Sequence, residues 1–333
     1  MKNKSLGLYN IIDNDRINKS INNVLRSNIN FNTYTSPKGL KELREEISYF
    51  LSNIWNHNVN YKDILITTGS QQSINLIAYS LLKEGDTVLI EQPTYFGSIR
   101  AFKNRKINLI GIDLKEDGFD LELLEDKIIK YKPKLIYVTP TFNNPTGYSW
   151  SNNYRKIFLD LINKYNILVL EDDPYSLINF TDIEYRSLYE LNDGKNIIYL
   201  GTFSKYISPS INVGYILSNS NILNKIYSFK ESFDLCTSLF IQLVILDYLK
   251  NNDLKKIINK RILTYKRFLE QTISNLNNRN DVLDYSKPKG GLFIWIKFND
   301  QINNEIFENG NNYYINENHD NETRINICNL LNK

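Results

Sequence analysis

The chain has 333 residues, of which 42% are hydrophobic, 13% are aromatic and 23% are charged, and its formal net charge is +3. This apolar content is too high for a disordered protein, and a chain of this length usually folds as two domains around a shared cleft. The balance of 40 basic and 37 acidic residues argues against a protein that holds nucleic acid through its phosphates, and no apolar run approaches the roughly 20 residues that cross a bilayer.

Short β-branched runs alternate with helical patterns over residues 61–215. The predicted strands are Ile64–Thr68, Thr87–Glu91, Ile107–Ile112, Leu135–Thr139, Ile167–Glu171, Ile197–Gly201 and Ile211–Ile216. The predicted helices between them are Gln71–Leu82, Tyr95–Lys103, Leu121–Lys130 and Asn153–Lys164. This alternation predicts a mostly parallel sheet that is covered on both faces, and such sheets bind ligands at the carboxyl ends of their strands.

The C-terminal part follows a different pattern. A long helix is predicted over Asp253–Leu276, and two strands, Val282–Tyr285 and Leu292–Phe298, follow it. This arrangement favours a second, smaller α+β domain. The segment Asn299–Thr323 is polar and rich in Asn and Glu, so we expect a loop or a poorly ordered insertion there.

Cysteine and histidine are scarce in this chain. Cys236 and Cys328 are far apart and provide neither metal-ligand spacing nor a disulfide framework, which favours a reducing, cytoplasmic compartment. With only His57 and His319, a mechanism that needs a histidine cluster is nearly excluded. The chemistry must therefore use Lys, Asp, Tyr, Arg or a cofactor, and no metal site is expected.

Polar segments follow two of the predicted strands. Gly69 and Ser70 begin a helix, where free amide groups form either an anion site or an ordinary helix cap. Asn143 and Asn144 come after the strand Leu135–Thr139, in a segment that alone is typical of an Asx turn.

Charged groups follow the next two strands. Glu171, Asp172 and Asp173 end a buried strand, where carboxylates are costly unless a cation pairs with them; the alternative is a solvated loop. Lys205 follows the strand Ile197–Gly201, and a lysine in such a place is usually an ordinary surface residue.

Together, and in this order, these segments resemble the aspartate-aminotransferase superfamily of pyridoxal-phosphate enzymes, fold type I. The branch most similar to the chain holds 2-aminoadipate aminotransferases and the aminotransferase-like half of MocR regulators. The resemblance covers roughly residues 32–328. It rests on Tyr34-Thr-Ser-Pro-Lys-Gly39, Gly69-Ser-Gln-Gln72, Glu91-Gln-Pro-Thr-Tyr95, Asn144-Pro-Thr-Gly147, Glu171-Asp-Asp-Pro-Tyr175, Ser204-Lys205, Gly290-Gly291 and Arg324-Ile-Asn326.

The resemblance implies an α/β fold with a mostly parallel seven-stranded sheet covered by helices and a smaller α+β C-terminal domain. Residues 1–33 would form an N-terminal segment that packs with the small domain, residues 34–250 the large cofactor-binding domain, and residues 251–333 the small domain. The resemblance also implies a homodimer, because Tyr34 would reach the cofactor phosphate of the neighbouring subunit.

The predicted catalytic residues are Lys205, Asp172 and Tyr175. By resemblance, Lys205 would hold pyridoxal phosphate as a Schiff base and move the α-proton of the substrate. Asp172 is preferred over Asp173 because relatives place a tyrosine three residues after this acid, and it would keep the pyridine nitrogen protonated. Arg324 would clamp the α-carboxylate of the substrate, a geometry that suits guanidinium.

The other contacts implied by the resemblance surround the cofactor ring and phosphate. Tyr175 and Asn144 would bond the phenolic oxygen of the ring, and Asn144 would also contact the substrate. Tyr95 would stack on the ring. The phosphate would be held by Ser70, Gln71 and Thr202.

Two features depart from the family pattern. Asn212 stands in Pro209-Ser-Ile-Asn-Val-Gly-Tyr215 where relatives carry an arginine that grips the phosphate. Only nine residues follow Arg324, so we expect a trimmed small domain in which Asn299–Thr323 replaces a structured segment.

The predicted function is a pyridoxal-phosphate-dependent aminotransferase that moves an amino group from an α-amino acid to a 2-oxo acid. One alternative is another reaction of the same cofactor, such as a lyase or decarboxylase reaction. The other is a degenerate, non-catalytic cofactor-binding partner protein. The residues before Tyr34 are too few for the DNA-binding domain of a regulator, so the expected partners are small molecules and a second subunit, without nucleic acid or membrane.

Overall fold

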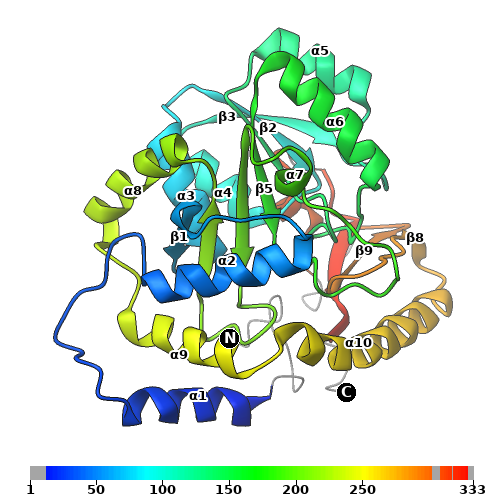
Figure 1. Ribbon diagram of the computed structural model, residues 1–333. Helices are drawn as coiled ribbons and strands as arrows, with labels where there is room; N and C mark the ends of the chain where they lie inside the picture. The colour runs from blue at the N-terminus through cyan, green and yellow to red at the C-terminus, as the bar shows by residue number, and fades with distance from the viewer. Residues whose placement is uncertain (1–12, 302–307, 317, 329–333) are drawn as a thin grey trace.

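The computed structural model describes residues 13–301, 308–316 and 318–328. A seven-stranded sheet lies at its centre, in the order β1-β7-β6-β5-β4-β2-β3 (Figure 1). Its strands are β1 (Ile64–Thr67), β2 (Thr87–Gln92), β3 (Asn108–Asp113), β4 (Leu135–Val138), β5 (Leu168–Asp173), β6 (Ile197–Thr202) and β7 (Gly214–Leu217). Strands β2 to β6 pair in parallel, and β7 runs antiparallel to both of its neighbours. The mostly parallel seven-stranded sheet predicted from the sequence is confirmed.

Both faces of this sheet are buried, because successive strand residues point to opposite sides. Ile64 and Ile66 belong to one core layer, whereas Leu65 between them belongs to the other. The first layer is covered by α2 (Lys41–Trp55), α5 (Leu121–Tyr131) and α6 (Asn152–Tyr165). The second is covered by α3 (Gly69–Leu81), α4 (Phe96–Asn104) and α8 (Ser220–Asp234).

A second, smaller sheet lies beside the large one (Figure 1). It is antiparallel, in the order β10-β9-β8, and consists of β8 (Val282–Tyr285), β9 (Phe293–Phe298) and β10 (Glu322–Asn326). The remaining helices are α1 (Asn14–Arg26), which packs on α9 (Leu239–Asn251), the long α10 (Leu254–Asn277), and the short α7 (Leu188–Leu191), η1 (Tyr61–Asp63) and η2 (Gly310–Tyr313). The domain boundaries stay a prediction.

Two predicted elements differ from the structure. Strand β7 begins at Gly214 rather than at Ile211, because Asn212 has a left-handed backbone with φ +47° that a strand does not accommodate. Residues 302–307 and 317 lie outside the described part of Asn299–Thr323. The described remainder is not a loop throughout, since it contains η2 and the first residues of β10.

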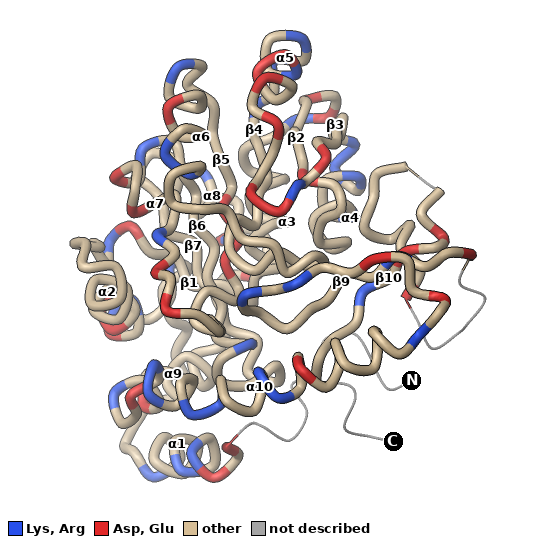
Figure 2. Tube along the Cα trace, turned by 90° about the vertical axis from the view of Figure 1, so that its right-hand side faces the viewer, with Lys and Arg blue, Asp and Glu red and all other residues tan. Residues whose placement is uncertain are grey.

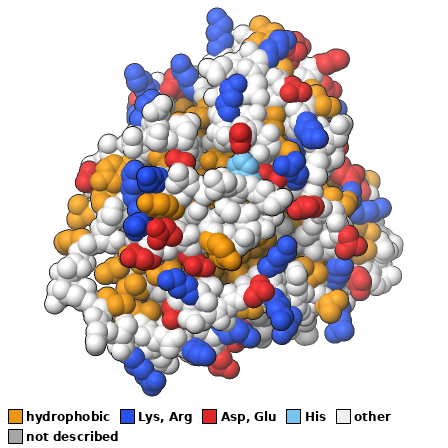
Figure 3. Space-filling view, in the orientation of Figure 1, with side chains coloured by type: hydrophobic (Ala, Val, Ile, Leu, Met, Phe, Trp, Pro, Cys, Tyr) orange, Lys and Arg blue, Asp and Glu red, His pale blue; other side chains and the backbone are white. Residues whose placement is uncertain are grey.

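Charged residues of both signs are interspersed along the outer helices (Figure 2), and the face shown in Figure 3 has the same mixture of side chains. Among the described residues, no helix is both long enough and apolar enough to cross a bilayer.

Candidate active site

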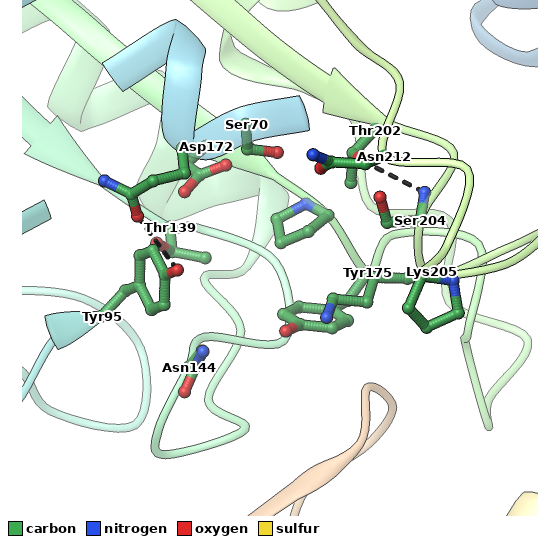
Figure 4. Close-up of a pocket in the computed structure, with 13 residues that line it drawn as sticks. Ser70, Tyr95, Thr139, Asn144, Asp172, Tyr175, Thr202, Ser204, Lys205 and Asn212 are labelled. Carbon is green, nitrogen blue, oxygen red and sulfur yellow. Dashed lines mark hydrogen bonds between the residues drawn. The ribbon is translucent and has the colours of Figure 1, made fainter. Parts of the chain in front are cut away.

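The candidate site is a cavity of about 230 Å³ at the carboxyl ends of β4, β5 and β6 (Figure 4). This is the edge at which an open α/β sheet binds its ligands. Among the predicted site residues, those that line the cavity are Ser70, Gln71, Tyr95, Asn144, Asp172, Tyr175, Thr202 and Lys205. Four others that line it were not predicted to take part, namely Thr139, Pro174, Ser204 and Pro209.

Asp172 is the next-to-last residue of β5, is buried and lines the cavity. Its Oδ2 accepts a hydrogen bond of 2.7 Å from the Tyr137 hydroxyl on β4, a partner that was not predicted. Its Oδ1 is buried and has no hydrogen-bond partner within the described structure. Burial raises the pKa of Asp172 to about 6, while the Tyr137 hydrogen bond opposes that rise. The carboxylate can therefore receive one more donor from the cavity.

The neighbouring acids are also buried, although no cation bonds them directly. Glu171 accepts hydrogen bonds from the amide groups at the start of α7, and Asp173 accepts from the Tyr199 hydroxyl at 2.8 Å. In the described part of the chain, neither forms an ion pair within 4 Å. Peptide N–H groups and a tyrosine hydroxyl therefore bond these two acids in place of a directly paired cation, while the positive charge of Arg155 opposes the rise in pKa that burial causes in both.

Lys205 follows β6 in the turn Thr202–Lys205 and is partly exposed to the cavity. The turn is fixed by the Ser204 amide, which donates to Thr202 Oγ1 at 3.2 Å. Burial, and after it the positive charge of Arg324, lowers the pKa of Lys205 to about 8, while Asp172 acts in the opposite direction. A neutral amine, the form that acts as a nucleophile or base, is therefore accessible near neutral pH.

The first turn of α3 forms one end of the cavity. The side chain of the preceding Thr68 makes no cap hydrogen bond, and Ser70, Thr202 and Asn212 face this end. Gly69 has φ +76°, and a Cβ there would lie 2.2 Å from Asn212 Oδ1, so the close approach requires glycine. Backbone amides at a helix start together with hydroxyl and amide side chains suit a phosphate.

Gln71 does not extend toward this end. Its Oε1 accepts a hydrogen bond of 3.1 Å from the Tyr95 hydroxyl, and its Nε2 donates to the Gly97 carbonyl. Gln71 therefore positions the Tyr95 ring in the cavity wall.

Arg324, on β10, approaches Asn144 from the small sheet. Its Nη1 donates to Asn144 Oδ1 at 2.7 Å, and its Nη2 donates to Glu308 Oε2 at 2.9 Å. The guanidinium lies 4.2 Å from the ring centroid of Phe293. The structure thus joins Arg324 to the cavity through Asn144, although Arg324 is not one of the residues that line it.

Tyr34 is not brought to the cavity of its own chain. Its side chain is 85% exposed. The predicted contact of Tyr34 with the phosphate of a second subunit stays a prediction.

Two acids near the site were not predicted to take part. Glu91 Oε2 accepts hydrogen bonds from the Thr139 amide and from Asn143 Nδ2, both at 2.9 Å, and so holds the turn that carries Asn144. Glu308 is the partner of Arg324. Glu91 stands in one of the recognised motifs, but nothing in the sequence near Glu308 connects it with Arg324.

A family model described as aminotransferase class I and II matches residues 9–330. The chain belongs to this family. An aromatic-amino-acid aminotransferase from Thermococcus litoralis is 30% identical over 279 residues, which cover 82% of this chain and 67% of that protein. A 2-aminoadipate transaminase from Thermus thermophilus is 31% identical over 269 residues, which cover 79% of this chain and 66% of that protein. The matched region thus amounts to about two thirds of the length of each relative.

The crystal structure of Pyrococcus horikoshii kynurenine aminotransferase in complex with PMP is similar to the whole fold. Its TM-score is 0.88 at 30% identity, and the match covers 96% of this chain and 83% of that one. The fold is therefore that of the fold-type-I aminotransferases, whose cofactor is pyridoxal phosphate. This confirms the family, fold and cofactor that the sequence motifs implied.

The cavity of this aminotransferase fits that cofactor. The buried Oδ1 of Asp172 lacks a hydrogen-bond donor, and a protonated pyridine nitrogen is a donor of suitable charge. Lys205 provides an amine in the same wall, and the first turn of α3 provides the phosphate end. These three features match the three polar parts of pyridoxal phosphate.

Proposed function

We propose that this protein is an aminotransferase that moves the amino group of an α-amino acid to a 2-oxo acid. The observation that supports this most directly is the pair formed by Lys205 and Asp172 in one cavity wall. One is an amine whose pKa is lowered to about 8, and the other is a carboxylate with an unpartnered oxygen. Bound pyridoxal phosphate supplies an electron sink for the bonds of the substrate α-carbon.

In this proposal, each side chain has a defined task. Lys205 holds the cofactor and then accepts and returns the proton of the substrate α-carbon, for which a pKa near the working pH is suited. Asp172 accepts the hydrogen bond of the pyridine nitrogen and keeps it protonated. Tyr175 and Asn144 orient the phenolic oxygen of the ring, and Tyr95 covers a face of the ring. Ser70 and Thr202 line the end of the cavity that would hold the phosphate, whereas the Gln71 side chain bonds Tyr95.

Arg324 binds the part that all substrates share, the α-carboxylate. A guanidinium makes two parallel hydrogen bonds to a carboxylate, and the Asn144 bond of 2.7 Å fixes its orientation. Asn144 would therefore contact both cofactor and substrate.

We also propose a cytoplasmic homodimer in which residues 34–250 bind the cofactor and residues 251–333 form the small domain. Residues 1–33 form an N-terminal segment, whose helix α1 packs on α9 rather than on the small sheet. The exposed Tyr34 supports a site that is shared between subunits.

A half-reaction with the purified holoenzyme tests the activity. We expect amino acids added one at a time to change the absorbance of the bound cofactor, and an added 2-oxo acid to restore it. Release of ammonia without a second substrate would indicate a lyase instead, and release of carbon dioxide a decarboxylase. A cofactor-loaded protein that responds to no amino acid would indicate a non-catalytic partner protein.

The Lys205→Ala variant should lose both turnover and the visible absorbance of the bound cofactor, because only an amine can hold the cofactor covalently. The matched control is Lys195→Ala, since Lys195 is an exposed lysine before β6. Visible absorbance that survives in the Lys205 variant would show that another lysine carries the cofactor.

A further inference from the structure

The carboxylate of Glu308 pairs with the guanidinium of Arg324, the group to which the proposed function assigns the α-carboxylate of the substrate. We propose that Glu308 is a competing counter-ion in the substrate site: its carboxylate pairs with Arg324 in the substrate-free protein, and every α-carboxylate must displace it to bind. This inference rests on the proposed role of Arg324. The substrates would be α-amino carboxylates, whose anionic group has the charge and shape of the Glu308 side chain.

Two aromatic rings, Asn144 and Glu308 contact the Arg324 guanidinium. The Phe293 ring centroid lies 4.2 Å from the guanidinium carbon, and that of Tyr313 lies 5.1 Å from it. Asn144 accepts from Nη1 at 2.7 Å, and Glu308 accepts from Nη2 at 2.9 Å. Glu308 therefore already bonds a donor, Nη2, that an incoming carboxylate would need for two parallel hydrogen bonds to the guanidinium.

The two members of this ion pair differ in their contact with water. The side chain of Arg324 is 1% exposed, and that of Glu308 is 29% exposed. A buried guanidinium requires a counter-ion, since an unpaired buried charge is strongly unfavourable. Glu308 can turn into water when another anion replaces it, whereas Arg324 stays buried with either partner.

From Glu308 onward, hydrogen bonds hold the main chain of this segment in place, so displacement of the carboxylate requires a movement of the side chain. The Thr323 hydroxyl donates to the Glu308 carbonyl at 2.7 Å, and the Thr94 amide donates to the Tyr313 carbonyl at 2.9 Å. The Tyr313 hydroxyl donates to the Glu308 carboxylate. These contacts tie the segment 308–316 to both β10 and the end of β2, with Glu308 presented to Arg324.

The test measures binding of carboxylates that lack an amino group, so that no reaction follows. Calorimetry with the holoenzyme would use 3-phenylpropanoate, 4-methylpentanoate and glutarate, which differ in everything except the shared carboxylate. Glu308→Gln removes the competing charge at nearly constant size. Because a charge-assisted hydrogen bond is lost from the free state only, each ligand should bind roughly tenfold more tightly.

Glu322→Gln is the matched control. Glu322 precedes Arg324 by two residues on β10, but its carboxylate accepts from the Tyr314 hydroxyl and lies beside His319. This variant should bind all three ligands as the unmodified protein does. Glu308→Ala should act in the same direction as Glu308→Gln, which shows that a new amide contact is not the cause.

The dependence on Arg324 completes the test. In an Arg324→Ala background, Glu308→Gln should have no further effect, because the two residues act on one site. With amino-acid substrates, Glu308→Gln should lower KM by a common factor and leave kcat unchanged. Equal or weaker carboxylate binding by folded Glu308→Gln protein would overturn the inference. Tighter carboxylate binding without any amino-group transfer would instead reject the proposed function.

Discussion

Single side chains at the phosphate end of the cavity determine how firmly the cofactor is held. Lys205 is the one basic residue among the described residues that line the cavity. We assign it to the aldehyde group of the cofactor rather than to the phosphate. The phosphate end presents Ser70, Thr202 and Asn212, which are all neutral. Cofactor phosphate carries nearly two negative charges, so its retention depends on helix dipole and uncharged donors.

Replacing Asn212 by arginine should therefore slow cofactor loss. A charge-assisted hydrogen bond contributes roughly 1.5–3 kcal/mol, which corresponds to roughly ten- to hundredfold slower dissociation. The measurement is the dissociation rate of the cofactor at two salt concentrations, and the gain should shrink at high salt. Asn212→Gln, which is longer but neutral, is the control. If the unmodified protein already retains its cofactor as firmly as the arginine variant, a cation outside this cavity holds the phosphate.

The lowered pKa of Lys205 predicts how cofactor uptake depends on pH. Burial, then Arg324, lowers that pKa from 10.5 to about 8, and only the neutral amine reacts. Uptake of pyridoxal phosphate by the cofactor-free protein should become faster with rising pH, with a midpoint near pH 8, and should level off above it. Arg324→Ala should move the midpoint upward. Stopped-flow absorbance between pH 6 and pH 10 measures this, and a midpoint near 10.5 in the unmodified protein would contradict the prediction.

At the scale of elements, the turn after β4 connects the two sheets. Glu91, at the end of β2, holds Asn143 and the Thr139 amide, while the buried Arg155 donates to the Pro140 carbonyl at 2.8 Å. The same turn presents Asn144 to Arg324. The site therefore depends on a carboxyl group that contacts neither cofactor nor substrate.

Because the pKa of Glu91 is raised in the folded protein, we expect the free energy of unfolding to fall as the pH rises. Burial raises its pKa from 4.5 to about 8 in the folded state. Below pH 4.5 the Glu91 carboxyl is protonated in both the folded and the unfolded protein. Between pH 4.5 and about pH 8 it is ionised in the unfolded chain but still protonated in the folded one, so the free energy of unfolding falls as the pH rises. Glu91→Gln should remove part of this fall, leaving that of Glu171, whose pKa is also raised by burial.

The measurement for Glu91 is Tm at pH 5 and at pH 8, where the variant should lose fewer degrees than the unmodified protein. Glu122→Gln, at an exposed position in α5, is the control and should keep the full difference. An equal loss for the Glu91 variant would mean that Glu91 is ionised in the folded protein.

The elements that the sequence predicted best are those with a strong local signal. Strands of the large sheet are buried on both faces, so they are continuous apolar runs such as Ile64–Thr67. Strand β10, Glu322–Asn326, was not predicted, because its polar residues are buried by contacts that form only in the folded chain, such as those with β9, Glu308 and Asn144. Helices α8 and α9 were likewise not assigned from the sequence.

The same distinction applies to the candidate site. Residues that follow strands, such as Asp172 and Lys205, were predicted because motifs mark them and the sheet brings them to one edge. The pairs Glu91–Asn143 and Glu308–Arg324 were not, because each joins segments that only the folded chain brings together. The run Glu171–Asp173 indicated that buried carboxyl groups need partners, but it did not indicate that tyrosine hydroxyls would donate hydrogen bonds to two of them.

At the scale of the whole molecule, one chain leaves a set of apolar side chains exposed near its N-terminal segment. Tyr34 is 85% exposed and Phe31 is 45% exposed, and the Phe31 ring lies 6.2 Å from that of Phe240 on α9. Just before α9, Phe233 is 61% exposed and Leu235 is 55% exposed. Exposed apolar groups of this kind are typical of an interface, which supports the proposed homodimer.

The contribution of Tyr34 across that interface can be tested by mixing two inactive or weakened variants. Lys205→Ala has no covalent site, and Tyr34→Ala should hold its cofactor less firmly. In a mixed dimer, the site with an intact Lys205 belongs to the Tyr34→Ala chain and receives its tyrosine from the Lys205→Ala chain, so that site is fully intact. After random exchange of equal amounts, about a quarter of all sites should therefore regain normal cofactor retention. Light scattering would confirm the dimer, and slow dissociation from that fraction would identify the restored sites. If Tyr34 served its own chain, mixing would restore none of them, and retention would equal that of the Tyr34→Ala protein.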